Sequence, residues 1–269
     1  MSWMDKFCQR TMTLGDGTKI SYDIRNGRPQ VRREENGVYS IFNANGATIT
    51  GSRDGSNVNI YGGNNVTFNG KGDGRDNISL FDCTGTKVNG NAGNDNISIY
   101  GGQGNKVNGG KGNDNIRNFS NGTTINGGKG NDSIYSRGYN NSISGGRGND
   151  RISVFGGNNS VSGGRGNDTI YNNGSNNTIN GGRGRDSIYS RGNDNTLRGG
   201  SGRDYISSYG SYNSVFGGSG NDSIYSSGNY NRVKGGWGSD NINSFGFGNK
   251  NSGGRGFDRI NTNDSRYWG

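Results

Sequence analysis

The sequence predicts an all-β protein: a parallel β-roll or β-solenoid with 18-residue coils, two short strands per coil and a small N-terminal β cap. Glycine contributes 56 of the 269 residues and only 25% of the chain is apolar, which excludes a conventional globular core. One nonapeptide recurs every 18 residues along most of the chain. A fixed period of this length is typical of a solenoid, in which each repeat buries its apolar residue by stacking on its neighbours.

The first half of each coil is a glycine-rich nonapeptide, seen as GGKGNDNIR at 109–117 and as GGRGNDTIY at 163–171. Eleven copies lie between residues 71 and 261, and the eighth position of each is isoleucine. Because side chains alternate faces along a strand, we expect this isoleucine to point inward and its neighbours to point outward. The sixth position is aspartate in every copy: Asp76, Asp95, Asp114, Asp132, Asp150, Asp168, Asp186, Asp204, Asp222, Asp240 and Asp258.

These aspartates are predicted metal ligands. Glycines at positions one, two and four allow positive φ, so the turn can fold its carbonyl oxygens towards one point, and the aspartate completes an oxygen cage. Oxygen-only ligation in a flexible geometry favours calcium over zinc or copper. Stacking places each aspartate between two turns, so the eleven turns predict up to about ten calcium ions in one row.

The second half of each coil has a different character, as in SRGYNNSIS at 136–144. It carries an apolar residue at its eighth position, and asparagine replaces aspartate two residues earlier. We expect these asparagines to be structural, because a repeated buried amide can satisfy hydrogen bonds up the stack. They are Asn105, Asn141, Asn159, Asn177, Asn195, Asn213, Asn231 and Asn249.

The pattern GGxGxDxUx over residues 71–261 resembles the RTX (hemolysin-type) calcium-binding repeat family. The resemblance implies calcium held between stacked turns, folding coupled to calcium, and type I export. Family members commonly bind ions on both sides of a coil, whereas the asparagine side here resembles the xxNxVxG repeats of antifreeze β-rolls, so we expect one row. The start of the chain lacks the apolar core of a Sec signal peptide, so an extracellular or surface-associated location follows from the motif alone.

Three segments are expected along the chain. Residues 1–50 are predicted to form an N-terminal cap, with a short helical turn begun by Ser2 and Asp5 and with hairpin signals at Asn26-Gly27 and Asn36-Gly37. Residues 51–70 resemble a degenerate first coil, and residues 71–269 form the RTX-like β-roll. The cap would cover strand edges that otherwise invite aggregation.

The chain is basic, with 30 Lys and Arg against 21 Asp and Glu and a pI of about 9.6. Part of this charge lies at the third motif position, in Lys111, Lys129, Arg147, Arg165, Arg183 and Arg255. This column either keeps the protein soluble or binds an acidic polysaccharide or other polyanion. On a column expected to lie nearby, Tyr135, Tyr171, Tyr189 and Tyr225 offer stacking faces.

An enzyme is not expected. The chain has no histidine, the motif aspartates are committed to metal, and Asp194 and Asp264 are expected to be surface loop residues. No transmembrane segment is predicted. The preferred function is a calcium-dependent structural or adhesive rod. The alternatives are an ice-binding β-solenoid, for which the outward Thr and Ser column is too mixed, and a nucleic-acid-binding basic solenoid, for which no recognised module is present.

Overall fold

The structure is a computed structural model that describes residues 8–263. The chain forms two compact units, Met1–Ile134 and Tyr135–Gly269. Both are built from β-strands, with one short 3-10 turn, η1 (Ile24–Asn26). The helical turn expected at Ser2 and Asp5 lies outside the described residues. The predicted all-β parallel solenoid is confirmed.

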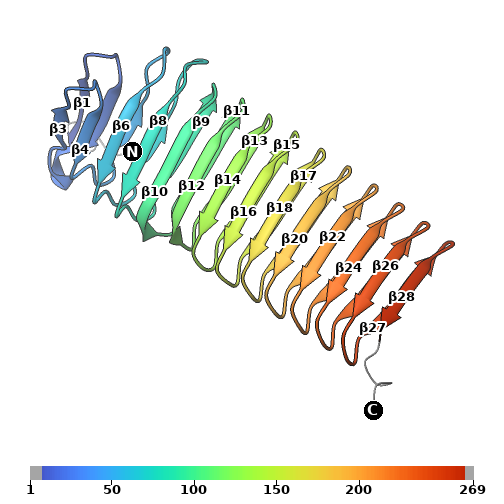
Figure 1. The fold of residues 1–269 in the computed structure, drawn as a ribbon. Helices are drawn as coiled ribbons and strands as arrows, with labels where there is room; N and C mark the ends of the chain where they lie inside the picture. Colours follow the sequence, from blue (N-terminus) through green and yellow to red (C-terminus); the bar gives the residue numbers. More distant parts are fainter. Residues whose placement is uncertain (1–7, 264–269) are drawn as a thin grey trace. The chain divides into compact units, whose positions relative to one another are not determined.

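The first unit contains two sheets of strands. In the repeat coils, the strands before each motif aspartate belong to sheet A and the strands after it belong to sheet B. Figure 1 shows the strands of the first unit in blue to green. Sheet A consists of β1 (Gln9–Thr13), β2 (Lys19–Asp23), β5 (Thr48–Thr50), β7 (Thr67–Asn69), β9 (Lys87–Ala92), β11 (Lys106–Lys111) and β13 (Thr124–Lys129). Sheet B consists of β3 (Gln30–Arg33), β4 (Tyr39–Phe42), β6 (Asn57–Tyr61), β8 (Asn77–Phe81), β10 (Asn96–Gln103) and β12 (Asn115–Asn121).

The unit begins with two antiparallel pairs, β1 with β2 and β3 with β4. The second pair is the hairpin that Asn36-Gly37 predicts, whereas Asn26-Gly27 ends the η1 turn instead. Parallel pairing already starts at β4 and β5, which pair with β6 and β7. The antiparallel strands therefore cover the first parallel strands of both sheets.

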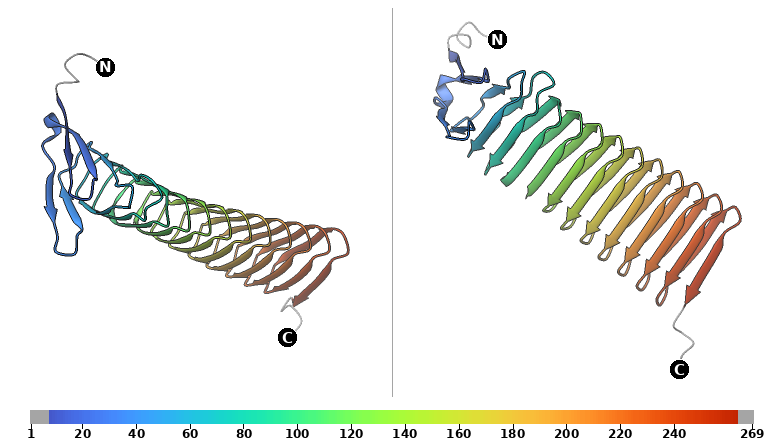
Figure 2. Two further views of the ribbon diagram at one scale, coloured as in Figure 1. Left: turned by 90° about the horizontal axis from the view of Figure 1, so that it is seen from above. Right: turned by 45° about the horizontal axis from the view of Figure 1, so that its top comes forward.

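The second unit repeats the two-sheet pattern with parallel strands throughout, and Figure 2 shows these strands as two layers (yellow to red). Its sheet A consists of β15 (Ser142–Arg147), β17 (Ser160–Arg165), β19 (Thr178–Arg183), β21 (Thr196–Ser201), β23 (Ser214–Ser219), β25 (Arg232–Trp237) and β27 (Lys250–Arg255). Its sheet B consists of β16 (Arg151–Phe155), β18 (Thr169–Asn173), β20 (Ser187–Arg191), β22 (Tyr205–Tyr209), β24 (Ser223–Ser227), β26 (Asn241–Phe245) and β28 (Arg259–Asn263). Strand β14 (Ser133–Arg137) spans the boundary between the units.

The register follows the repeat. In the second unit each residue pairs with the residue 18 positions later, for example Ile170 with Ile188. Several coils of the first unit are longer: Asn96 pairs with Asn115, and the register shifts by one residue between Tyr100 and Gln103. The 18-residue period therefore holds throughout the second unit and is relaxed in the first, where strand β10 accommodates an extra residue as a bulge.

The interior is thin and contains the predicted apolar ladders. Coil positions are numbered 1–18 from the first glycine of the nonapeptide. Position 8 on sheet B and position 17 on sheet A are buried, as at Ile170 and Ile179, which are both 0% exposed. Burying each such side chain contributes about 1.5–3 kcal/mol. No helix in the described residues is long and apolar enough to cross a membrane.

Candidate functional site

The turn after sheet A is built from glycines that bring successive coils close together. Gly164 and Gly166 have positive φ angles of 119° and 129°. A Cβ on Gly164 would lie 2.2 Å from the carbonyl oxygen of Gly146, and one on Gly166 would lie 2.0 Å from that of Gly148, in the preceding coil. Only glycine fits at these positions, because carbonyl oxygens of the preceding coil lie directly against the turn.

The motif aspartates follow this turn and point inward, forming a column in each unit. The N–H of Asp150 donates to Oδ1 of Asp168, and the N–H of Asp168 donates to Oδ1 of Asp186, both at 2.8 Å. The same bond continues to Asp258 in the second unit and links Asp76 to Asp132 in the first. Ten of the eleven aspartates are at most 2% exposed, and Asp258 is half-buried.

The second carboxylate oxygen of this column is left without a donor. Oδ2 is buried and has no hydrogen-bond partner in Asp76, Asp95, Asp114, Asp168, Asp186, Asp204, Asp222 and Asp240. A buried carboxylate oxygen without a partner is costly, so each of these eight carboxyl groups requires a cation or a proton. The described residues contain no group of three His, Cys, Asp or Glu side chains that could hold a metal, so main-chain oxygens would have to complete the shell of an ion here.

Burial makes these carboxyls hard to ionise in the absence of a cation. Removal from water raises the pKa of Asp76 and of Asp186 to about 7, and that of Asp168 to about 6. The N–H bond to Oδ1 opposes this rise without cancelling it. At Asp186 the carboxylates of Asp168 and Asp204 add to the increase in pKa. The column therefore favours a bound positive charge near neutral pH.

The asparagine side has the same hydrogen bond from a main-chain N–H to Oδ1 of the next coil, but its second side-chain atom also has hydrogen-bond partners. The N–H of Asn159 donates to Oδ1 of Asn177 at 2.7 Å, as in the aspartate column. The amide nitrogen of Asn177, however, donates to the carbonyl oxygen of Gly156 at 2.9 Å and to Oδ1 of Asn172 at 2.8 Å. The expected structural role of these asparagines is confirmed, although the amides bond mainly to the main chain of the neighbouring coils instead of to one another.

The donor set on the aspartate side fits calcium. Eight of the motif aspartates, Asp168 among them, offer a buried carboxylate oxygen without a hydrogen-bond donor, beside a glycine turn in which main-chain carbonyl oxygens are closely spaced. Hard oxygen ligands of this kind are those that calcium prefers. The asparagine side offers amide nitrogens that already donate, so the donor set favours one row of ions.

The cations of the third motif position form an exposed column at the end of the sheet A strands. Arg147 pairs in register with Arg165, and Arg165 pairs with Arg183. All six predicted cations, Lys111, Lys129, Arg147, Arg165, Arg183 and Arg255, are exposed. Like charges placed directly opposite one another on neighbouring strands are destabilising, so this arrangement costs stability unless an anion offsets the repulsion.

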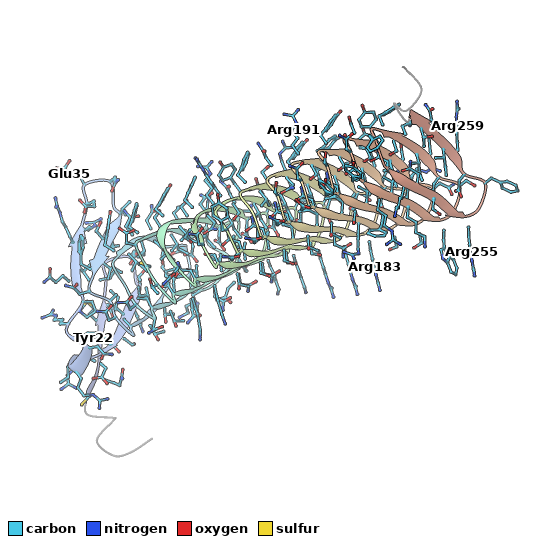
Figure 3. The ribbon with its side chains drawn as sticks, turned by 90° about the horizontal axis from the view of Figure 1, so that it is seen from below. Tyr22, Glu35, Arg183, Arg191, Arg255 and Arg259 are labelled. Atoms are coloured by element: carbon cyan, nitrogen blue, oxygen red, sulfur yellow. The ribbon has the colours of Figure 1, made fainter. Side chains whose placement is uncertain are left out.

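The tyrosines expected beside this column lie elsewhere. Tyr171 and Tyr189 belong to strands β18 and β20 of sheet B, whereas the cations belong to sheet A. In Figure 3, Arg183 of sheet A and Arg191 of sheet B project from opposite sides of the second unit. The expectation of a nearby column was wrong, because the turn between positions 3 and 9 carries the chain from one sheet to the other.

Two features were not predicted from the sequence. Position 10 forms an inward column of small polar side chains, such as Asn172 and Ser190, which hydrogen bond to each other at 2.9 Å. Aromatic rings also alternate between positions 9 and 11 on the outward face of sheet B, as at Tyr189 and Tyr209. Strict alternation along the strand from the inward position 8 would have predicted both results, because it puts position 10 inside and positions 9 and 11 outside. Asp194 is exposed in a loop as expected, and Asp264 lies outside the described residues.

Comparison with known proteins identifies the repeat. The model of the RTX calcium-binding nonapeptide repeat family matches the chain in four copies, at residues 120–138, 135–170, 171–206 and 213–244. No curated protein and no solved structure matches the chain. Residues 120–244 therefore carry RTX calcium-binding repeats, and the predicted family and calcium cofactor are confirmed.

Proposed function

Because the chain carries RTX calcium-binding repeats, we propose that it is a non-enzymatic β-roll whose folding is coupled to calcium and which serves as a structural or adhesive element. The observation that carries this proposal is the column of buried Oδ2 atoms that lack a hydrogen-bond donor. We assign the eleven motif aspartates, Asp76 to Asp258, as calcium ligands, together with carbonyl oxygens of the glycine turns. Bound calcium would supply the positive charge that this column lacks.

Coupling of folding to calcium follows from the composition. A chain with 56 glycines loses a large amount of backbone entropy on folding, and its two apolar ladders offset only part of that loss. Without cations, the buried carboxylates oppose folding further. Binding energy from the ions then becomes folding energy.

A calcium titration followed by circular dichroism tests this proposal. Adding calcium to the chelated protein at neutral pH should convert a disordered spectrum into a β spectrum, and a chelator should reverse the change. Calorimetry should give a stoichiometry near the ten ions of one row. A β spectrum and a melting temperature that are unchanged in excess chelator would refute the coupling.

The cation column of sheet A supports a second part of the proposal, the binding of an acidic polysaccharide. In the second unit the described residues carry 14 Lys and Arg but only one acidic residue outside the aspartate column, Asp194. Once calcium neutralises the aspartates, the outer surface of this unit is almost purely cationic. Arg147, Arg165 and Arg183 repeat at the coil spacing of about 4.8 Å and can follow a polyanion.

Elution from immobilised heparin tests the cation column. Replacing Arg147, Arg165 and Arg183 together by Ser should lower the salt concentration at elution without changing the circular dichroism spectrum in calcium. Serine already occupies the same position at Ser201 and Ser219, so the turn tolerates it. The matched control removes the same charge from cations of the second unit that lie outside the column.

In this control, Arg232, Lys250 and Arg259 are replaced by Ser, which occupies the same coil positions at Ser214, Ser160 and Ser187. Equal shifts in elution for the two triple variants would show that only net charge matters and would refute a binding column.

The remaining parts of the proposal rest on the repeat family. RTX repeats support an extracellular or surface location, reached by type I export, and residues 1–50 are proposed as a cap on the array.

A further inference from the structure

Sheet B of the second unit carries a groove on its outward face. The groove has a volume of about 350 Å³, and its walls include Phe155, Tyr171, Asn173, Tyr189, Arg191 and Tyr209. These residues come from four successive strands, β16, β18, β20 and β22. The groove therefore runs along the stack of coils and lies on the sheet that does not carry the cation column.

The groove exists because the aromatic column at position 11 is interrupted. In the first unit this column is continuous, and neighbouring rings stack with centroids 4.7–5.4 Å apart and interplanar angles of 6–13°. In the second unit Asn173 and Arg191 replace two rings between Phe155 and Tyr209. Phe155 packs on Tyr135 of the preceding coil and Tyr209 packs on Tyr225 of the following coil, so each has its ring partner on the side away from the groove.

A pair of stacked tyrosines at position 9 forms the side wall. The rings of Tyr171 and Tyr189 lie 5.1 Å apart at an angle of 10°. The guanidinium of Arg151 lies 4.7 Å above the other face of the Tyr171 ring. The wall is thus apolar along the ring edges, rigid because the rings support each other, and carries phenol hydroxyls that can hydrogen bond.

The charge on this face has one sign. Arg191 lines the groove and projects from sheet B (Figure 3), and Arg151 lies beside its wall. Strands β16 to β28 carry no Asp or Glu at any position. A ligand in this groove therefore meets apolar ring surface, amide and hydroxyl groups, and guanidinium groups without competing carboxylates.

We propose that this groove binds a short segment of an acidic glycan, with uronic acid units along the coil axis. The C–H surface of a sugar ring can pack on the tyrosine wall and on the ring faces of Phe155 and Tyr209. Sugar hydroxyls can hydrogen bond to Asn173, and a carboxylate can pair with Arg191. The inference does not depend on the cation column of sheet A.

The spacing of the coils favours a glycan over a single-stranded nucleic acid. Coils repeat every ~4.8 Å, a length close to that of one sugar unit in an extended glycan, so successive units meet equivalent positions of successive coils. Bases that stay stacked as in a DNA helix repeat at about 3.4 Å and would fall out of step with the coils.

Titration calorimetry in calcium with a hyaluronan hexasaccharide tests the proposal, with cellopentaose as the neutral glycan and oligo(dT) as the nucleic acid. The parent protein should bind hyaluronan best. Tyr189→Ser should weaken this binding about tenfold. Arg191→Ser should weaken it by a similar factor and remove the preference over cellopentaose. Serine occupies the same two coil positions at Ser207 and Ser227, so both variants are compatible with the fold.

A third variant fills the groove without removing a charged or aromatic wall group. Asn173→Tyr extends the ring column as in the first unit and should abolish binding while circular dichroism and thermal stability are retained. Two matched controls, Tyr212→Asn outside the groove and Arg183→Ser in the cation column, should bind hyaluronan within about twofold of the parent, and Asn176 already occupies the coil position of Tyr212.

Several results would overturn the inference. They are failure of the parent protein to bind hyaluronan, unchanged binding by Arg191→Ser or Asn173→Tyr, equal affinity for cellopentaose, and tighter binding of oligo(dT). Loss of hyaluronan binding in Arg183→Ser alone would place the ligand on sheet A. That outcome would refute the groove and leave the proposed cation column intact, so the two proposals fail separately.

Discussion

Asp168→Asn should destabilise the protein by an amount that grows with calcium. The substitution keeps the shape of the side chain and keeps Oδ1, which accepts the N–H of Asp150 at 2.8 Å. It replaces Oδ2, which is buried without a donor, by a neutral amide. If the carboxylate holds calcium, each ion lost removes about 1.4 kcal/mol of stability for every tenfold rise in free calcium above its Kd, or about 2.7 kcal/mol at a hundredfold excess.

Asn177→Asp is the matched control on the other side of the same coil. The asparagine amide donates to the carbonyl oxygen of Gly156 at 2.9 Å and to Oδ1 of Asn172 at 2.8 Å. A carboxylate cannot donate, so the change removes two hydrogen bonds, worth about 2 kcal/mol together, and also buries a charge. This cost should be the same at every calcium concentration.

Urea unfolding, followed by circular dichroism at several free calcium concentrations, separates the two cases. The loss of stability in Asp168→Asn, plotted against the logarithm of calcium, should rise with the slope given above, and that of Asn177→Asp should stay flat. A flat line for Asp168→Asn would show that this carboxylate is not a calcium ligand. A higher ion count in Asn177→Asp would show that both sides of the coil can bind calcium, contrary to the single row.

Three further outcomes are expected. Burial raises the pKa of Asp186 from 3.8 to about 7, so this carboxyl favours the calcium-free fold fully below pH 3.8 and progressively less as the pH rises through about 7. Without calcium the protein should therefore be more structured by circular dichroism at pH 5 than at pH 8, and with calcium the order should reverse. Gly164→Ala, whose Cβ would lie 2.2 Å from the carbonyl oxygen of Gly146, should cost more than about 2 kcal/mol in urea unfolding, whereas Gly62→Ala, with nothing within 4 Å, should cost about 1 kcal/mol. Ile170→Ala, at a site that is 0% exposed, should cost about 2–5 kcal/mol in the same assay.

The repeat made most of the fold predictable. Ile170 and Asp168 recur at fixed positions, and alternation along a strand then places the isoleucine inside. The start of the solenoid was harder to predict from the sequence. Parallel pairing begins at Tyr39 and Thr48, where the sequence carries no copy of the nonapeptide. In that region the antiparallel and the parallel strands have the same alternation of apolar and polar residues. The sequence pattern therefore does not show which strands pair or in which direction.

The surfaces were harder to predict than the core. Asn172 and Ser190 look like solvent-exposed residues in the sequence, yet they are buried and bonded to each other. Tyr189 and Arg183 are close in the chain, yet they belong to different sheets. Small polar and aromatic residues occur on either face of a strand, so composition alone assigns neither set a side.

The two sides of a coil show how one atom can determine whether a turn requires a metal. Asp168 and Asn177 both accept a main-chain N–H through Oδ1, so the backbone ladder is the same on both sides. The second atom differs: the amide nitrogen of Asn177 finds the oxygen of Gly156, whereas Oδ2 of Asp168 finds no donor. A coil with asparagine on both sides would close without an ion and would lose its dependence on calcium. A coil with aspartate on both sides would bury twice the negative charge and would lose the amide donor of its asparagine side, so it would be less stable at every calcium concentration. In the observed pairing, the asparagine side has its hydrogen bonds without an ion, whereas the aspartate side needs a cation. Calcium therefore controls whether the stack forms, and the asparagine side fixes its register.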